Sequence, residues 1–328
     1  MISGFKTRRI IKQKKEVKQK MKLYKRKEND QAPVGQADPY LIKGDDGRYY
    51  LYSTGGYLFS SDSLTEGWEY DGVCLKMDGQ KVCWAPSVIE IEGKYYMYYS
   101  SMDADTEDEH GQTLRLAVSD SPRGPFIYCK DMMPPFSIDP HVVQTPSGFY
   151  MFYCNNDVQT ERPGTCILCD KMLDPYTLEG NPQKVVWPTL DEEIYMRDRF
   201  QKGQHWHTIE GAFYFFKDGI HYLMYSGACF RNPTYFIGYC TAHGPREADL
   251  RTLKWKKYPD EHTYAPLMKK NSFVEGVGHN SVIFDGDTCY VVYHGRDYQE
   301  NHGEEDTRCA RMDRMEIEGE KLSVKMTP

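Results

Sequence analysis

Apolar and aromatic residues along this chain come in pairs of short runs, and each pair is joined by a Gly-containing turn. In the second pair, the run 83–89 (CWAPSVI) is followed by a turn at Gly93 and the run 95–99 (YYMYY). Aromatic and β-branched residues favour strands, so each pair predicts a β-hairpin. The five hairpins begin with ADPYLI at 37–42, CWAPSVI at 83–89, IDPHVV at 138–143, IEGAFYF at 209–215 and GHNSVIF at 278–284.

The spacing of these hairpins leaves room for two further strands in each unit. Segments 114–118 and 236–240 have the composition of such strands. Five four-stranded units arranged in a ring form a five-bladed β-propeller. We therefore predict an all-β chain, with one propeller domain over residues 31–328. A β-sandwich is the alternative, and the fivefold repetition of one motif argues against it.

The N-terminal segment, residues 1–30, differs in character from the rest of the chain. Twelve Lys or Arg against two Glu give residues 1–28 a charge of +10, which leaves −17 for the remainder, since the total is −7. Residues 6–28 lack Gly and Pro, which predicts a helical extension. We expect this extension to pack on its own domain or to join two subunits in a homo-oligomer. An arm for nucleic acid or membrane is the alternative, and only its charge supports it.

The remaining composition indicates which partners and compartment to expect. An acidic body argues against nucleic acid as the partner, and no apolar run is long enough to span a membrane. The basic start is not followed by an apolar stretch, so no secretion signal is expected. These features predict a cytoplasmic protein whose ten cysteines are thiols. Cys166 and Cys169 form a lone C-x-x-C pair, which we interpret as strand thiols rather than a zinc site.

The second residue of each of these five segments carries a polar or aromatic side chain. In a propeller the innermost strand of each blade lines the central channel, so matched positions in five blades converge. Charged groups beside apolar runs cost solvation free energy unless they are paired or functional. We therefore predict one site at one end of the channel, made by Asp38, Trp84, Asp139, Glu210 and His279.

Three carboxylates and aromatic side chains suit glycoside hydrolysis. That reaction needs a protonated acid at the leaving oxygen and an ionised carboxylate opposite it. A third carboxylate near the acid raises the pKa of that acid through like-charge repulsion. Trp84 would then form a wall for a sugar ring.

Several segments of the chain resemble glycoside hydrolase family 43. They are ADP at 37–39, WAPSV at 84–88, SPRGPF at 121–126, IDP at 138–140, IEG at 209–211, GHNSV at 278–282 and YHGR at 293–296. The resemblance covers residues 31–328 and implies a five-bladed propeller of inverting enzymes acting on arabinofuranosides, xylosides and related linkages. It implies that Asp38 is the general base, that Glu210 is the general acid, and that Asp139 adjusts the pKa of this acid.

The resemblance also implies an ion and further substrate contacts. His279 matches the family's central His, often near calcium, although His279 alone is not a metal site; no organic cofactor is expected. Arg308 is the best match for a late substrate-binding Arg, with Arg296 second. His205 and His207 share one side of a strand, and we give His207 a substrate-binding role. The acidic stretch 103–110 is expected to be a solvated loop, or else a rim that repels acidic sugars.

The predicted substrate is a plant-derived oligosaccharide. Without a secretion signal, an exo-acting α-L-arabinofuranosidase or β-D-xylosidase is favoured over an enzyme that degrades polymers. A fructan-type furanosidase on a related propeller is one alternative, disfavoured because Ala37 stands where such enzymes have Asn before the Asp. A sugar-binding propeller without catalysis is the other, and the complete set of three carboxylates argues against it.

Overall fold

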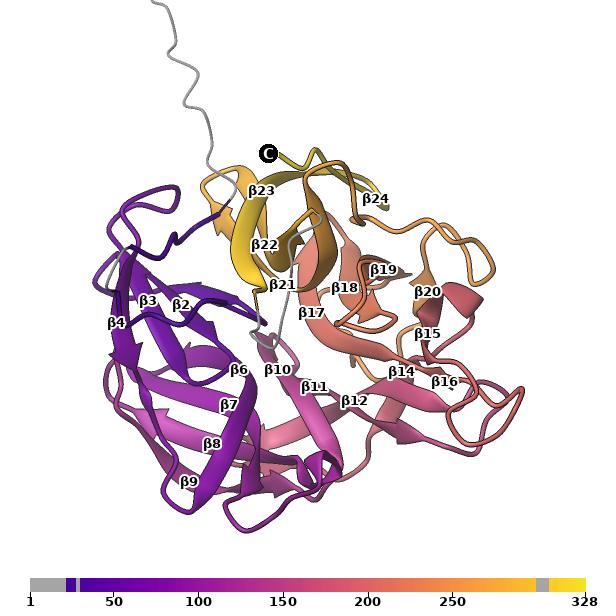
Figure 1. Ribbon diagram of the computed structural model, residues 1–328, viewed down its shortest axis with the longest axis horizontal. Helices are drawn as coiled ribbons and strands as arrows, with labels where there is room; N and C mark the ends of the chain where they lie inside the picture. The colour runs from indigo at the N-terminus through magenta and orange to yellow at the C-terminus, as the bar shows by residue number, and fades with distance from the viewer. Residues whose placement is uncertain (1–21, 28–29, 299–306) are drawn as a thin grey trace, which may run out of the picture.

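The computed structural model describes residues 22–27, 30–298 and 307–328 of the 328-residue chain. Its strands form five sheets arranged around a centre, as Figure 1 shows. The inner strands of neighbouring sheets are in contact all the way round the ring, in the order β1, β6, β10, β17, β21 and back to β1. The all-β propeller prediction is confirmed.

The first two blades are built almost entirely from consecutive antiparallel strands. Blade one contains β1 (Tyr40–Lys43), β2 (Tyr49–Ser53), β3 (Tyr57–Ser61) and β4 (Glu69–Val73). Blade two contains β6 (Gln80–Ile91), β7 (Lys94–Asp103), β8 (Thr113–Ser119) and β9 (Phe126–Met133), with β5 (Leu75–Lys76) parallel to β9 and the 3₁₀ turn η1 (Glu109–Gly111) after β7.

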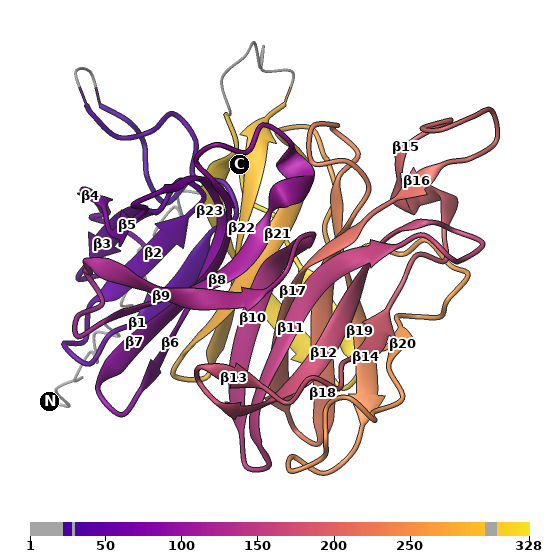
Figure 2. The ribbon, with the colours of Figure 1, turned by 90° about the horizontal axis from the view of Figure 1, so that it is seen from below.

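Blade three is the largest, because short strands add to the outer side of its third strand. It contains β10 (Ser137–Thr145), β11 (Gly148–Asp157), β12 (Gly164–Asp174), β13 (Thr177–Leu178), β14 (Gln183–Val186), β15 (Ile194–Met196) and β16 (Trp206–His207), with the 3₁₀ turn η2 (Asp191–Glu193) before β15. Figure 2 shows β15 and β16 projecting beyond one end of the blades.

The last two blades return to the simple four-stranded order. Blade four contains β17 (Ile209–Lys217), β18 (Ile220–Gly227), β19 (Phe236–His243) and β20 (Lys256–Lys257). Blade five contains β21 (Val274–Asp285), β22 (Thr288–Asp297), β23 (Cys309–Glu318) and β24 (Lys321–Val324). The five predicted hairpins are the first two strands of each blade, and segments 114–118 and 236–240 are strands as expected.

Both faces of a blade are buried, which explains runs such as FYMFY. Successive strand residues point to opposite faces, so Tyr150 and Phe152 pack against blade four, while Met151 and Tyr153 pack against blade two. The many tyrosines suit this arrangement, because a buried ring can place its hydroxyl group on a loop of the next blade. The hydroxyl group of Tyr98 donates to the carbonyl oxygen of Pro175 at 2.7 Å in this way.

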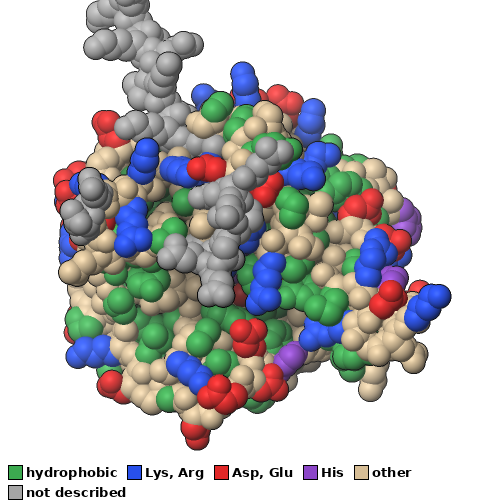
Figure 3. Space-filling model, in the orientation of Figure 1, with side chains coloured by type: hydrophobic (Ala, Val, Ile, Leu, Met, Phe, Trp, Pro, Cys, Tyr) green, Lys and Arg blue, Asp and Glu red, His purple; other side chains and the backbone are tan. Residues whose placement is uncertain are grey.

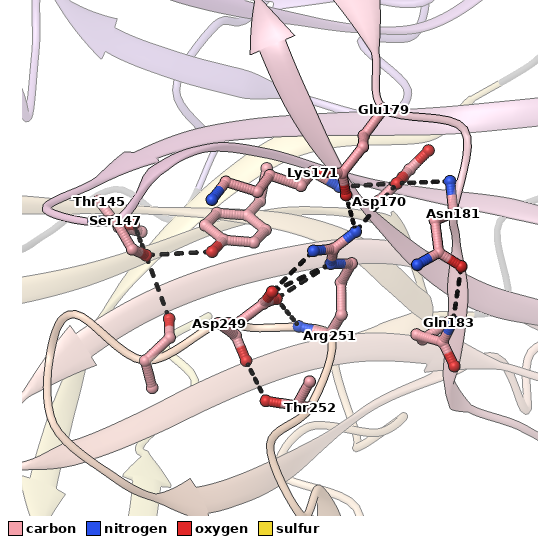
Figure 4. Close-up of polar contacts among 12 residues, drawn as sticks. Thr145, Ser147, Asp170, Lys171, Glu179, Asn181, Gln183, Asp249, Arg251 and Thr252 are labelled. Atoms are coloured by element: carbon pink, nitrogen blue, oxygen red, sulfur yellow. Dashed lines mark hydrogen bonds and ion pairs between the residues drawn. The ribbon is translucent and has the colours of Figure 1, made fainter.

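An ionic cluster joins blades three and four at the end away from the bulges described below (Figure 4). Arg251 donates to both carboxylate oxygens of Asp249, at 3.0 Å from Nε and 2.7 Å from Nη2. Its Nη1 also pairs with Glu179 and lies 3.8 Å from Asp170. Burying most of the guanidinium is tolerated because three carboxylates surround it.

The described part of the N-terminal extension is not helical. Lys22 forms an isolated antiparallel bridge with Arg311, and Leu23 donates its backbone N–H to the carbonyl oxygen of Ala310 at 2.9 Å. Leu23 and Tyr24 are buried, and the ring of Tyr24 packs on Phe59 of blade one. Tertiary packing outweighs the modest helix propensity of this segment. The rest of the predicted helix lies outside the described residues.

Candidate active site

The same backbone irregularity occurs at the start of every inner strand. In blades two to five, two inner-strand residues oppose a single residue of the next strand, which is a β-bulge. The first residue of each bulge, and the equivalent Asp38 of blade one, has a positive φ. These residues are Asp38 (54°), Ala85 (43°), Asp139 (56°), Gly211 (64°) and His279 (42°).

A bulge frees a backbone N–H from the strand ladder, and four of these N–H groups are satisfied by side chains of the preceding blade. Ala85 donates to Thr54 Oγ1 at 3.0 Å, and His279 donates to Ser226 Oγ at 2.7 Å. Asp38 donates to His294 Nδ1 at 3.1 Å, and Gly211 donates to Asp139 Oδ2 at 3.0 Å. The bulges therefore fix neighbouring blades to one another where they meet the channel.

This geometry corrects the predicted alignment of the five motifs. Asp38, Asp139 and His279 occupy the first bulge position, whereas Trp84 and Glu210 lie one residue earlier. The convergence itself is as predicted, because all five line one cavity of about 620 Å³, called here the central cavity. Arg308 also lines it, as the sequence predicted.

Asp38 is buried and surrounded by hydrogen-bond donors and a cation. Thr54 Oγ1 donates to its Oδ2 at 2.5 Å, and Arg308 Nη1 donates to its Oδ1 at 3.3 Å. His279 Nδ1 lies 3.4 Å from the same Oδ1. Burial alone would raise the pKa of Asp38, but Arg308, His279 and His294 outweigh burial and hold that pKa well below its usual range. Burial lowers the pKa of His294 to about 4, so His294 is uncharged at neutral pH, whereas the guanidinium of Arg308 stays charged beside Asp38.

Glu210 and Asp139 have the opposite electrostatic environment. Burial, reinforced by the Asp139 carboxylate, raises the pKa of Glu210 to about 8. Burial and the Asp38 carboxylate likewise raise the pKa of Asp139 to about 8. Two neighbouring carboxyl groups of this kind titrate as a pair. We infer that the pair retains a proton at neutral pH while Asp38 is ionised.

Sequence reasoning missed the residue that positions Glu210. Tyr235, a buried residue just before β19, donates its hydroxyl to Glu210 Oε1 at 2.7 Å, and its ring stacks on His294. Gly278 makes room for that ring, since a Cβ atom there would lie 1.8 Å from Tyr235 Cε1. The available signal in the sequence was Gly278 of GHNSV. That signal did not identify Tyr235, because only tertiary contact reveals which side chain a small residue accommodates.

We expect Gly278→Ala to lower kcat by roughly tenfold or more, because the displaced Tyr235 ring no longer holds Glu210. Overpacking of this kind costs about 1–3 kcal/mol of stability, so the melting temperature falls as well. Gly286→Ala is the control: unlike Gly278, Gly286 has a positive φ, of 59°, and no atom lies within 4 Å of the added Cβ. That control should lose stability with unchanged kcat; equal kcat in the two variants would contradict the role of Gly278.

Two predicted substrate contacts lie outside the central cavity. Arg296 is buried and donates from Nη2 to the carbonyl oxygen of Phe230 at 2.8 Å. Phe230 in turn lines the cavity, and the Arg308 guanidinium lies 4.6 Å from its ring centroid. Arg296 therefore positions a cavity wall through the backbone of Phe230.

His207 faces a second cavity of about 520 Å³ on the other side of the β15–β16 loop. His205 lines it too, so the prediction that these two side chains share one side is confirmed. Arg162 Nη1 donates to His207 Nε2 at 3.2 Å. Strand alternation explains the difference from prediction, since the neighbouring Trp206 and Thr208 point into the central cavity instead.

The residues around His279 do not match a calcium cage. Calcium takes six to eight oxygen ligands, whereas His279 Nδ1 faces the carboxylates of Asp38 and Asp139 at 3.4 and 3.7 Å. Within the described residues, no group of three or more His, Cys, Asp or Glu side chains is arranged to hold a metal ion. Calcium stays a prediction from resemblance. Cys166 and Cys169 are buried free thiols.

Comparison with known proteins shows the family and the fold of this chain. The model of the family described as glycosyl hydrolases family 43 matches residues 30–321. A crystal structure described as that of a thermostable family-43 glycoside hydrolase is similar, with a TM-score of 0.74 and 30% identity over 90% of this chain and 95% of that chain.

Two curated relatives carry arabinan-related names. The probable arabinan endo-1,5-α-L-arabinosidase C of Aspergillus flavus is 47% identical over 72 residues, which cover 19% of this chain and 23% of that protein. The extracellular exo-α-(1→5)-L-arabinofuranosidase of Streptomyces avermitilis is 24% identical over 309 residues, 82% of this chain and 56% of that protein. The chain thus matches less than two thirds of the length of either relative.

Proposed function

This chain belongs to glycosyl hydrolase family 43, and from that premise we propose that it is an inverting, exo-acting glycosidase that removes an α-L-arabinofuranosyl or β-D-xylosyl unit from an oligosaccharide. The observation that carries the proposal is the contrast between two carboxyl groups in one cavity. The pKa of Glu210 is raised to about 8, and the pKa of Asp38 is held well below its usual range. Environments that push two pKa values apart are how enzymes assign an acid and a base.

The chemistry follows from these two protonation states. Glu210 donates its proton to the glycosidic oxygen, which leaves with the electron pair of the breaking bond. A water molecule attacks the anomeric carbon from the opposite side and gives its proton to Asp38. Inversion requires the two carboxyl groups to be about 6.5–9.5 Å apart, so that this water fits between them. Asp139 orients the backbone that carries Glu210 by accepting from Gly211.

Exo action is supported by the rim of the central cavity. Arg199, in the loop after β15, donates from Nη2 to Nε2 of His110 in η1 at 3.2 Å. Both residues line the cavity, so loops of blades two and three meet at its rim. A rim joined in this way favours a pocket for chain ends over a groove open at both sides. The names of the curated relatives favour arabinofuranose as the sugar.

A panel of aryl glycosides tests the proposal: α-L-arabinofuranoside, β-D-xyloside, β-D-galactoside and β-D-fructofuranoside. We expect turnover of the first or second, with NMR showing a product of inverted anomeric configuration. Turnover of the fructofuranoside alone would replace the proposal with a fructan-type activity. No turnover, combined with binding of arabino- or xylo-oligosaccharides, would indicate a sugar-binding propeller.

The pH profile of kcat/KM gives a second prediction. A general acid works only while protonated, so activity should fall as the pH rises through about 8. The low pKa of Asp38 keeps the base ionised in acid, so the acidic limb of the profile should lie below about pH 4. Asp139→Asn removes the like charge beside Glu210, and we expect the alkaline limb to move down by roughly 1–3 pH units. An unmoved alkaline limb in Asp139→Asn would refute the coupling of the two groups.

The partner, the cellular location and the oligomeric state of the protein remain predictions. We propose an oligosaccharide as the partner, a cytoplasmic location, and a homo-oligomer formed through the N-terminal extension, most of which lies outside the described residues. No helix among the described residues has both the length and the apolar composition that crossing a bilayer requires. Sedimentation of the full chain and of a chain starting at residue 22 tests the role of the extension.

A further inference from the structure

A third cavity, of about 610 Å³, lies directly beside the central cavity. We call it the basic cavity, because Arg197, Lys269 and Lys270 line it. Tyr195 lines both cavities, so its side chain lies at the boundary between them. The walls come from η2, from β15 and the residue after it, and from the segments before β19 and β21.

The charge of the basic cavity is only partly neutralised from within. Arg162 and, to a lesser extent, Arg197 lower the pKa of Asp191, whereas Lys269 and Lys270 form no salt bridge within the described residues; all three cations of the cavity are exposed. One of its two carboxylates, Asp191, is already paired with Arg162 at 2.6 Å, which leaves Glu192 as the other negative group. Unpaired cations gathered beside a sugar site are unexpected in a chain whose net charge is −7.

Aromatic groups accompany these cations. Lys269 Nζ lies 5.6 Å from the ring centroid of Tyr264, and Tyr195 forms the boundary with the central cavity. Tyrosine offers a sugar both an apolar face and a hydroxyl group, and a carboxylate forms short, strong hydrogen bonds to ammonium and guanidinium donors. Together, these groups match a sugar ring that bears a carboxylate.

The rim of the central cavity carries negative charge as well. Glu109 lines the cavity next to His110, which accepts from Arg199 of the loop after β15 at 3.2 Å. In Figure 3, Lys and Arg side chains lie between the centre and the right edge, towards β15 and β20, whereas Asp and Glu gather below the centre. The cations of the basic cavity therefore attract a negatively charged substituent and orient the substrate that carries it.

We propose that the basic cavity binds the carboxylate of a uronic acid residue in the oligosaccharide whose terminal sugar occupies the central cavity. This inference rests on the proposed glycosidase function and adds the substrate class, an acidic oligosaccharide. The lysines and Arg197 act through charge, so their contribution weakens as salt rises. Tyr195 and Tyr264 contact the sugar ring.

The test compares two arabino- or xylo-oligosaccharides that differ only in one uronic acid residue. We expect the acidic substrate to have a KM at least about fivefold lower than the neutral one at low ionic strength, with the difference shrinking in about 0.5 M NaCl. Lys269→Ala/Lys270→Ala and Arg197→Ala should remove that difference without changing kcat or the KM of the neutral substrate. Lys94→Ala/Lys321→Ala, at turns distant from the cavity, is the charge-matched control and should behave as wild type.

The outcomes separate this inference from the proposed function. If neither substrate is hydrolysed, the proposed function fails, and calorimetry of Glu210→Gln with both oligosaccharides still tests the basic cavity. If the neutral substrate is hydrolysed and the acidic one shows no lower KM, the basic cavity does not bind uronate. A further outcome would also overturn the inference. If free glucuronate inhibits hydrolysis of the acidic and of the neutral substrate equally, and Lys269→Ala/Lys270→Ala abolishes that inhibition, the basic cavity is a site for small anions only.

Discussion

Glu210→Gln should lose about 10²–10⁴-fold in kcat on natural oligosaccharides, because the amide has no proton of suitable acidity for the glycosidic oxygen. That loss corresponds to about 3–5 kcal/mol of transition-state stabilisation at about 1.36 kcal/mol for each factor of ten. The effect should depend on the leaving group. An aryl glycoside with a strongly acidic phenol needs no protonation, so its rate should fall far less.

The leaving-group series distinguishes loss of the acid from loss of the fold. Glu193→Gln is the matched control, since Glu193 is fully buried and pairs with Lys257 Nζ at 2.5 Å, outside the central cavity. We expect that control to lower the melting temperature while its dependence on the leaving group stays that of wild type. A Glu210→Gln variant that loses the same factor on every aryl glycoside would contradict the role of general acid.

Asp38→Asn should lose at least as much rate, about 10³–10⁴-fold, and should lose it on every substrate. The attacking water must give up its proton in each case, whatever the leaving group. The amide introduced by this substitution has no basic lone pair for that proton, although it is close in shape to the carboxylate. Thr54 and Arg308 keep the side chain of Asp38 in place in the wild-type protein.

Azide rescue tests the position of Asp38 as well as its charge. Asp38→Ala leaves space near the anomeric carbon, and we expect added azide to restore turnover and give a glycosyl azide of inverted configuration. Asp170→Asn serves as the control, since Asp170 is another buried aspartate but lies in the cluster around Arg251. Retention of wild-type rate by Asp38→Asn on any aryl glycoside would refute the assignment of the base.

The repeated hairpins were predictable because each follows from local chemistry. A run such as YYMYY has no polar face, which indicates a strand buried on both sides, and a Gly turn closes the hairpin. Five such units leave few arrangements other than a ring. The convergence of Asp38, Asp139, Glu210 and His279 then followed from the symmetry of a propeller, without any knowledge of the side-chain contacts.

The alignment within the motifs was less accurate, for a physical reason. The bulge that sets the left-handed residue is a property of strand pairing, and only the partner strand shows that Glu210 precedes the bulge while Asp139 begins it. Strand pairing also decides which way a side chain points. His207 was expected in the central cavity, but its neighbour Trp206 lines that cavity and His207 faces the second one. The position of Leu23 depends likewise on β23, whose Ala310 accepts from its backbone N–H.

The sequence by itself determined the blades, the turns and the residue types that carry the chemistry, because these depend on interactions between near neighbours in the chain. Only the tertiary structure decided which protonation states those residues adopt. Asp38 and Glu210 are both acidic side chains, and their pKa values separate because Arg308 lies beside one and Asp139 beside the other. Residues as far apart as Gly278, Tyr235 and Glu210 act as one unit because burial and electrostatics depend on distance in space.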